Sequence, residues 1–143
     1  HHTPGTEKGM AEIFRVLAPG GGACITVNYE NILLRPWMFP LTRWVVRRAG
    51  VRLHGVGRMS ADTSREAFVR YYDGVDNPLG KVYTRRQAAR RLREAGFQIT
   101  DHQVYYFPVR FIPGLSNCPT EILKWLDRCF GTMIFFSVRK PAS

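Results

Sequence analysis

A helix that ends in a proline and three glycines, and is followed directly by an apolar strand, most constrains how this chain can fold. Its apolar residues recur at the spacing of one helix face: Met10, Ile13, Phe14 and Leu17. Thr3 and Pro4 suit the N-cap and the first turn of this helix. Pro19 and Gly20–Gly22 cannot continue it, and residues 23–29 are then typical of a strand. This succession predicts a helix-to-strand unit of an α/β fold.

The middle of the chain is expected to be helical and interrupted by turns. Residues 33–50 carry many large apolar side chains, but Pro36 and Pro40 break the run, so one or two helices are expected rather than a membrane span. A further short helix is predicted around residues 64–72. Residues 73–80 hold Asp-Gly and Asn-Pro pairs, which indicate turns.

The last third predicts helix, strand, helix and strand. Thr84 to Gln87 is a capping-box pattern that opens a helix ending at Gly96. Residues 97–109 are typical of a strand, and His102 is expected on its exposed face. Pro119 opens a helix, and residues 132–138 predict a mostly buried final strand.

Composition excludes some classes of protein. The chain has 143 residues, of which 45% are hydrophobic, enough for one domain with a core and too apolar for disorder. The three cysteines are odd in number and lack CxxC spacing, so neither a disulfide framework nor a metal site is predicted. A reducing, cytoplasmic compartment is the simpler expectation.

Three segments together resemble the class I S-adenosylmethionine-dependent methyltransferases of the type 11-like group. The helix end and strand at residues 12–29 resemble the part of that family that leads into its fifth strand, with Ala18 in place of the usual lysine. Residues 1–4 resemble a motif that follows the fourth strand, and Gly5 replaces its usual acidic residue. Residues 73–97 resemble a third motif, found in one subgroup.

The resemblance implies an α/β fold, the C-terminal half of a Rossmann-like methyltransferase sandwich with a helical lid insertion. Residues 1–31 would supply a helix and a strand of the core, 32–80 the lid, and 81–143 the C-terminal helices and strands, the last strand antiparallel. The family's glycine-rich cofactor loop has no counterpart, because Gly20–Gly22 follows a helix rather than a strand. The resemblance therefore implies a portion that is inactive without an N-terminal half. Its unpaired sheet edge would bind that half or another copy of the chain.

The cofactor implied by the resemblance is S-adenosyl-L-methionine. His1 or His2 would lie beside its methionine part, because ligands of open α/β sheets bind outside the carboxyl ends of strands. The two histidines could instead be the remnant of a purification tag, although their continuity with the following segment favours a native origin. No catalytic residue is assigned, since methyl transfer requires a general base only when the acceptor is protonated.

Five further residues are candidates for binding a small-molecule methyl acceptor. Asn28 and Tyr29 end the first predicted strand, whereas Asp76, Asn77 and Tyr83 lie between the lid and the capped helix. The alternative is that they are turn formers, or in the case of Tyr29 a side chain packed under the lid.

Positive charge is concentrated in two runs. The net charge is +10, and residues 35–58 and 81–93 each contain six basic residues and no acidic one. Such runs are usually solvated helix faces. Aromatic residues alternate with arginines between Trp37 and Arg48, however, which is typical of an interfacial segment as well as of an apolar lid. The alternative function is therefore a non-enzymatic binding module for nucleic acid or an anionic membrane surface. An apolar lid favours a small molecule over nucleic acid.

Overall fold

The computed structural model describes residues 5–48, 64–73, 80–107, 109 and 118–142. Three strands form the sheet: β1 (Gly22–Asn28), β2 (Gln98–Tyr105) and β3 (Met133–Arg139). Five α-helices and one short 3-10 helix surround it: α1 (Thr6–Val16), η1 (Ile32–Leu34), α2 (Phe39–Arg48), α3 (Arg65–Asp73), α4 (Arg85–Glu94) and α5 (Thr120–Phe130). The fold is thus mixed α/β, as the sequence predicts.

The last strand lies in the centre of the sheet. The strand order is β1-β3-β2, and β3 is antiparallel to both of its neighbours. Ile25 is opposite Phe136 and Val27 is opposite Ile134 in the register between β1 and β3. The two outer strands therefore run in the same direction, and the expected antiparallel last strand is confirmed.

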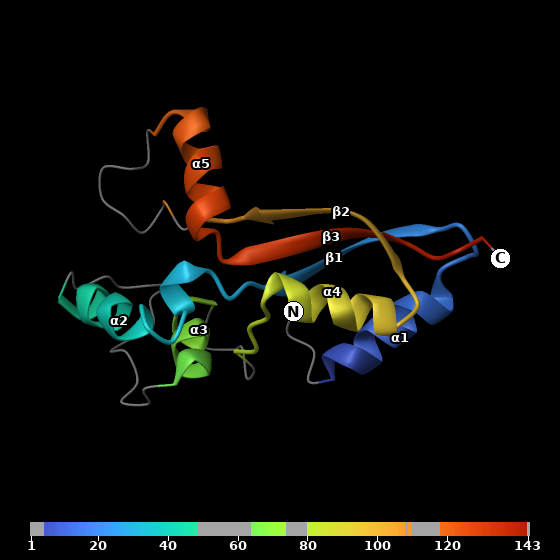
Figure 1. The fold of residues 1–143 in the computed structure, drawn as a ribbon, viewed down its shortest axis with the longest axis horizontal. Coiled ribbons are helices and arrows are strands. Elements are labelled where there is room, and N and C mark those ends of the chain that lie inside the picture. Colours follow the sequence, from blue (N-terminus) through green and yellow to red (C-terminus); the bar gives the residue numbers. More distant parts are fainter. Residues whose placement is uncertain (1–4, 49–63, 74–79, 108, 110–117, 143) are drawn as a thin grey trace.

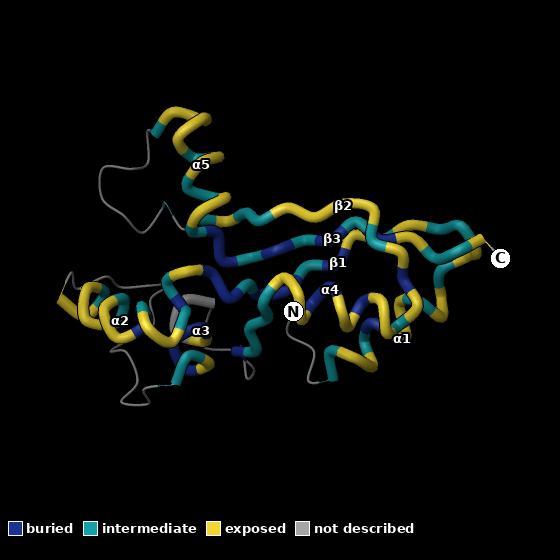
Figure 2. Tube along the Cα trace, in the orientation of Figure 1, coloured by how far each residue is buried: buried dark blue, intermediate teal, exposed yellow. Residues whose placement is uncertain are grey.

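Helices α1 and α4 cover one face of the sheet (Figure 1). Buried apolar side chains of both helices, of β1 and β3, and of Phe97 just before β2 form one core: Met10, Ile25, Val27, Ala88, Ala89, Leu92, Phe97, Ile134, Phe136 and Val138. Figure 2 shows this burial along β1 and β3, whereas β2 is largely exposed. Helix α5 stands at the end of β2, and α2 and α3 lie beyond the carboxyl end of β1 (Figure 1).

A second, smaller core joins the middle helices. Leu34 of η1, Phe39 of α2, and Phe68 and Val69 of α3 are buried together. The rings of Phe39 and Phe68 meet edge to face with centroids 5.5 Å apart. The helices predicted for residues 33–50 and 64–72 are confirmed, and the turns predicted at 74–79 lie outside the described residues.

The start of α1 differs from the prediction. The helix begins at Thr6, and Gly5 occupies the N-cap without a side-chain hydrogen bond, so the prediction of Thr3 and Pro4 as its start is wrong. Met10 is buried, but Ile13 is 37% exposed because it lies at the margin of the apolar stripe. The buried stripe of α1 is narrower than the spacing of its apolar residues suggests.

The turn after α1 is as predicted. The amide of Gly21 donates to the carbonyl of Ala18 over 2.9 Å, and Gly20, with φ of +75°, follows Pro19. Proline and a positive-φ glycine at the two central positions are the signature of a type II turn. The turn feeds directly into β1.

The capping box of α4 is also confirmed: the Thr84 side chain accepts from the amide of Gln87, whose side chain accepts from the amide of Thr84. His102 is exposed, as the sequence predicts, but the register of β2 against β3 shifts between Ile99 and Asp101. The shift turns His102 toward the helix-covered face, where its ring stacks on Phe136 with centroids 6.0 Å apart, although the residue remains exposed.

Candidate functional site

Three of the predicted binding residues meet at the carboxyl end of β1. Asn28 and Tyr29 leave the strand there, and Tyr83 forms an isolated parallel bridge with Tyr29. The other predicted site residues, His1, His2, Asp76 and Asn77, lie outside the described residues.

Backbone hydrogen bonds hold the Tyr83 segment against the outer edge of β1. The amide of Tyr83 donates to the carbonyl of Asn28, and the amide of Glu30 donates to the carbonyl of Tyr83, both over 2.9 Å. On the other side of the strand, the amide of Tyr29 donates to the carbonyl of Thr132 over 2.8 Å. The end of β1 is therefore fixed from both sides.

Asn28 is the most unusual residue of this group. Its side chain is 1% exposed, yet neither its Nδ2 nor its Oδ1 has a hydrogen-bond partner among the residues that the structure describes. Buried polar side chains are nearly always hydrogen-bonded, because an unsatisfied group costs about 1–3 kcal/mol. Such a cost at a strand end is typical of a site that holds a further polar group.

Asn31, three residues later, provides the contrast. It is buried to the same degree, but its Nδ2 donates to the carbonyls of Phe130 (2.9 Å) and Gly131 (3.1 Å). Its Oδ1 accepts from the amide of Leu33 over 3.0 Å, which caps η1. Asn31 is therefore a structural residue. Within the described part of the chain, no such hydrogen bonds explain the burial of its neighbour Asn28.

Two side-chain contacts at this site were not predicted. The hydroxyl of Tyr83 donates to Oγ1 of Thr6 over 3.0 Å, which brings the first turn of α1 to the site. Nη1 of Arg65 lies 2.8 Å from Oε1 of Glu30, and Glu30 is nearly buried. This ion pair ties α3 to the residue that follows Tyr29. In the sequence, the only indication of this ion pair was an acidic residue beside the end of an apolar strand.

The described residues of this group offer hydrogen-bonding side chains. The backbones of Asn28, Tyr29 and Tyr83 come together here. Successive strand residues direct their side chains to opposite faces, so the Asn28 amide lies on the other face of the sheet from the Tyr29 and Tyr83 side chains, which pack against the core. The nearby carboxylate of Glu30 is engaged by Arg65. No set of three His, Cys, Asp or Glu in the described part of the chain could hold a metal ion. The arrangement can orient a polar ligand.

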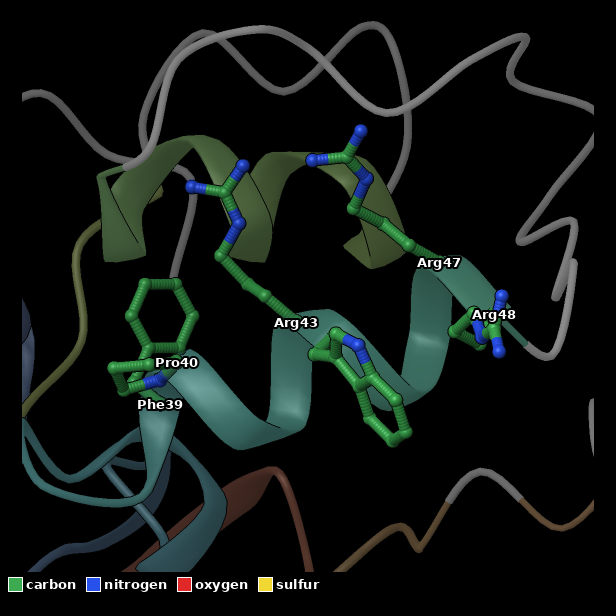
Figure 3. Close-up of a pocket in the computed structure, with 6 residues that line it drawn as sticks. Phe39, Pro40, Arg43, Arg47 and Arg48 are labelled. Atoms are coloured by element: carbon green, nitrogen blue, oxygen red, sulfur yellow. The ribbon is translucent and has the colours of Figure 1, made fainter.

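A cavity of about 710 Å³ lies elsewhere, along α2 (Figure 3). Its described lining comes entirely from this helix: Phe39, Pro40, Arg43, Trp44, Arg47 and Arg48. Figure 3 shows Arg43 and Arg47 extending from the same side of the helix. The cavity does not include the residues at the end of β1, so it is a separate surface.

No protein-family model matches the chain, and no curated protein matches it either. Within the described residues, no helix has the combination of length and apolar character that crossing a bilayer requires. What the chain does must therefore be inferred from its own residues.

Proposed function

We propose that this chain is the C-terminal portion of a class I S-adenosylmethionine-dependent methyltransferase that acts on a small-molecule acceptor. The buried amide of Asn28, which has no hydrogen-bond partner among the described residues, carries the proposal, because it lies where ligands of open α/β sheets bind, at the carboxyl end of a strand. The strand order adds support, since an antiparallel last strand between two parallel ones agrees with the motif resemblance.

The free edge of β1 supports an N-terminal half that completes the sheet. The carbonyl of Asn28 points away from β3, so the backbone groups of Thr26 and Cys24 face the same way in a regular ladder. Beyond Tyr83, no strand among the described residues pairs with this edge. Unlike β2, which carries polar residues and a register shift, β1 has no charged residue, proline or bulge that would protect an edge. It has the character of an interior strand.

In this proposal α2 and α3 form a lid over the acceptor. The Arg65–Glu30 ion pair fixes α3 beside the site, and the small core of Phe39 and Phe68 fixes α2 on α3. A lid of this kind excludes water and limits the acceptor's orientations.

S-Adenosylmethionine, when bound, supplies a methyl group attached to a positively charged sulfur. The residues of this chain would then act by positioning. The Asn28 amide can donate to and accept from a polar acceptor, and Tyr83, held by Thr6, keeps the strand end in place. The neutral amide and hydroxyls suit a cationic cofactor. An unpaired arginine in their place would repel it.

The test is calorimetry of S-adenosylmethionine binding to this chain and to a version extended upstream. Binding by the extended protein alone would support the proposal. In that protein, Asn28→Ala should weaken acceptor binding or raise its KM, whereas Gln103→Ala on the exposed strand β2 should change neither. If neither protein binds the cofactor, the methyltransferase assignment is wrong.

A further inference from the structure

Helix α2 presents an apolar stripe to the outside. Trp37, in the turn before the helix, and Leu41, Trp44 and Val45 within it recur at the spacing of one helix face. All four are exposed, Trp37 by 68% and Trp44 by 59%. Two exposed tryptophans, one on the ten-residue helix and one in the turn before it, need an explanation beyond ordinary surface composition.

The opposite face of α2 is already occupied. Phe39 is buried against Phe68 of α3, and Val46 packs against the same small core. Oγ1 of Thr42 donates to the carbonyl of Leu33 over 2.9 Å. The helix is therefore held firmly on one side, which leaves the stripe facing outward.

The charged residues of the segment that carries the stripe are all positive. Arg43, Arg47 and Arg48 belong to α2, and residues 31–48 contain no Asp or Glu. The guanidinium carbon of Arg48 lies 5.8 Å from the centre of the Trp44 ring. Figure 3 shows Arg43 and Arg47 reaching to one side of the helix. This combination matches a surface that is negatively charged on the outside and apolar beneath.

Helix α5 shows that exposed apolar residues alone are not distinctive. It also exposes Ile122 and Trp125, but its charges are balanced, and Lys124 pairs with Glu121 at 2.9 Å. The excess of positive charge is what separates α2 from α5.

We propose that the stripe of Trp37, Leu41, Trp44 and Val45, together with the arginines of the same helix, Arg43, Arg47 and Arg48, seats α2 on the surface of an anionic phospholipid bilayer. Tryptophan favours the headgroup level, and each arginine near an anionic surface strengthens binding about fivefold. Leu41 and Val45 lie beside the tryptophans and offer nothing to stack on or hydrogen-bond with bases, so acyl chains fit the stripe better than nucleic acid does. This inference goes beyond the proposed methyltransferase activity and does not depend on it.

Tryptophan emission of the full chain provides the first test. The chain has three tryptophans, so Trp125→Phe leaves only those of the stripe as reporters. With vesicles of equal parts phosphatidylcholine and phosphatidylglycerol, their emission should shift to the blue and be quenched by lipids brominated on the acyl chains. Phosphatidylcholine vesicles alone should cause no shift, and added salt should reverse it. The absence of a shift with anionic vesicles overturns the proposal.

Charge-reversal variants supply the matched control. Arg43→Glu with Arg47→Glu should lower the vesicle partition coefficient by at least about twenty-five-fold. Arg86→Glu with Arg93→Glu, on the exposed side of α4, changes the net charge equally and should lower it by less than about fivefold. Circular dichroism should show that both variants fold. Equal losses, or displacement of the protein from vesicles by a single-stranded oligonucleotide, overturn the proposal. Self-association that requires Trp44 and excludes vesicle binding also overturns the proposal.

Discussion

The Nζ of Lys140 donates a hydrogen bond to the carbonyl of Leu17 over 2.8 Å, and so joins the residue after β3 to the residue after α1. The same ammonium donates to the carbonyl of Phe14 over 2.9 Å and lies 4.8 Å from the centre of its ring. These carbonyls end a helix, where a cation is favoured.

Lys140→Met should therefore lower the free energy of unfolding by about 1–2 kcal/mol, as lost hydrogen bonds to a charged donor do. Urea denaturation measures this change. Lys124→Met removes an exposed ion pair with Glu121 and should cost no more than about 0.5 kcal/mol. Equal losses in the two variants would show that Lys140 does not hold α1.

Gly96→Ala should destabilise the chain by about 1–3 kcal/mol, because Gly96 has φ of +99° and a Cβ there would lie 2.8 Å from the ring of Phe14. Thermal denaturation measures the loss. Gly22→Ala is the matched control, since its Cβ would meet only the Val138 carbonyl at 3.5 Å. That control should be neutral or slightly stabilising, and a loss as large as that of Gly96→Ala would contradict the explanation.

Asn28 and Asn31 should respond in opposite ways to replacement by leucine. Asn28→Leu removes a buried amide that has no partner among the described residues, and it should leave the stability of this chain unchanged or raise it. Asn31→Leu removes three hydrogen bonds and should cost about 2–4 kcal/mol. Denaturation of the two variants under identical conditions checks this. A large loss for Asn28→Leu would mean that its amide is paired and structural.

Arg65→Met should loosen α3, because it leaves the nearly buried carboxylate of Glu30 without its partner. Since Arg65 itself is about one-third exposed, we expect a loss of about 1–2 kcal/mol. Hydrogen exchange should show that the substitution speeds amide exchange in α3 more than in α4. The double variant with Glu30→Gln should recover part of the loss, and no recovery would argue against a direct interaction.

Features set by neighbouring residues could be predicted from the sequence. The capping box at Thr84 and the turn at Pro19 depend on a few consecutive side chains, and both were found. The start of α1 was missed, because a helix without a side-chain cap leaves no local signal at Gly5.

Features set by distant residues could not be predicted. The hydroxyls of Tyr83 and Thr6 meet across 77 positions, and periodicity carries no information about such pairs. The face of the sheet on which His102 lies depends on a register shift against β3. Alternation within β2 cannot reveal this shift. Asn28 was identified by its place at a strand end, but only the surroundings reveal that its amide is unpaired.

The central place of β3 also sets when the sheet can form during synthesis. Among the described strands, β1 and β2 each pair with β3 alone, and β3 follows both of them in the chain. A ribosome that has not yet added residues 133–139 holds a nascent chain in which neither earlier strand has its partner. The apolar side chains of β1 must then stay shielded by α1 and α4, or by a chaperone, until these residues emerge from the exit tunnel.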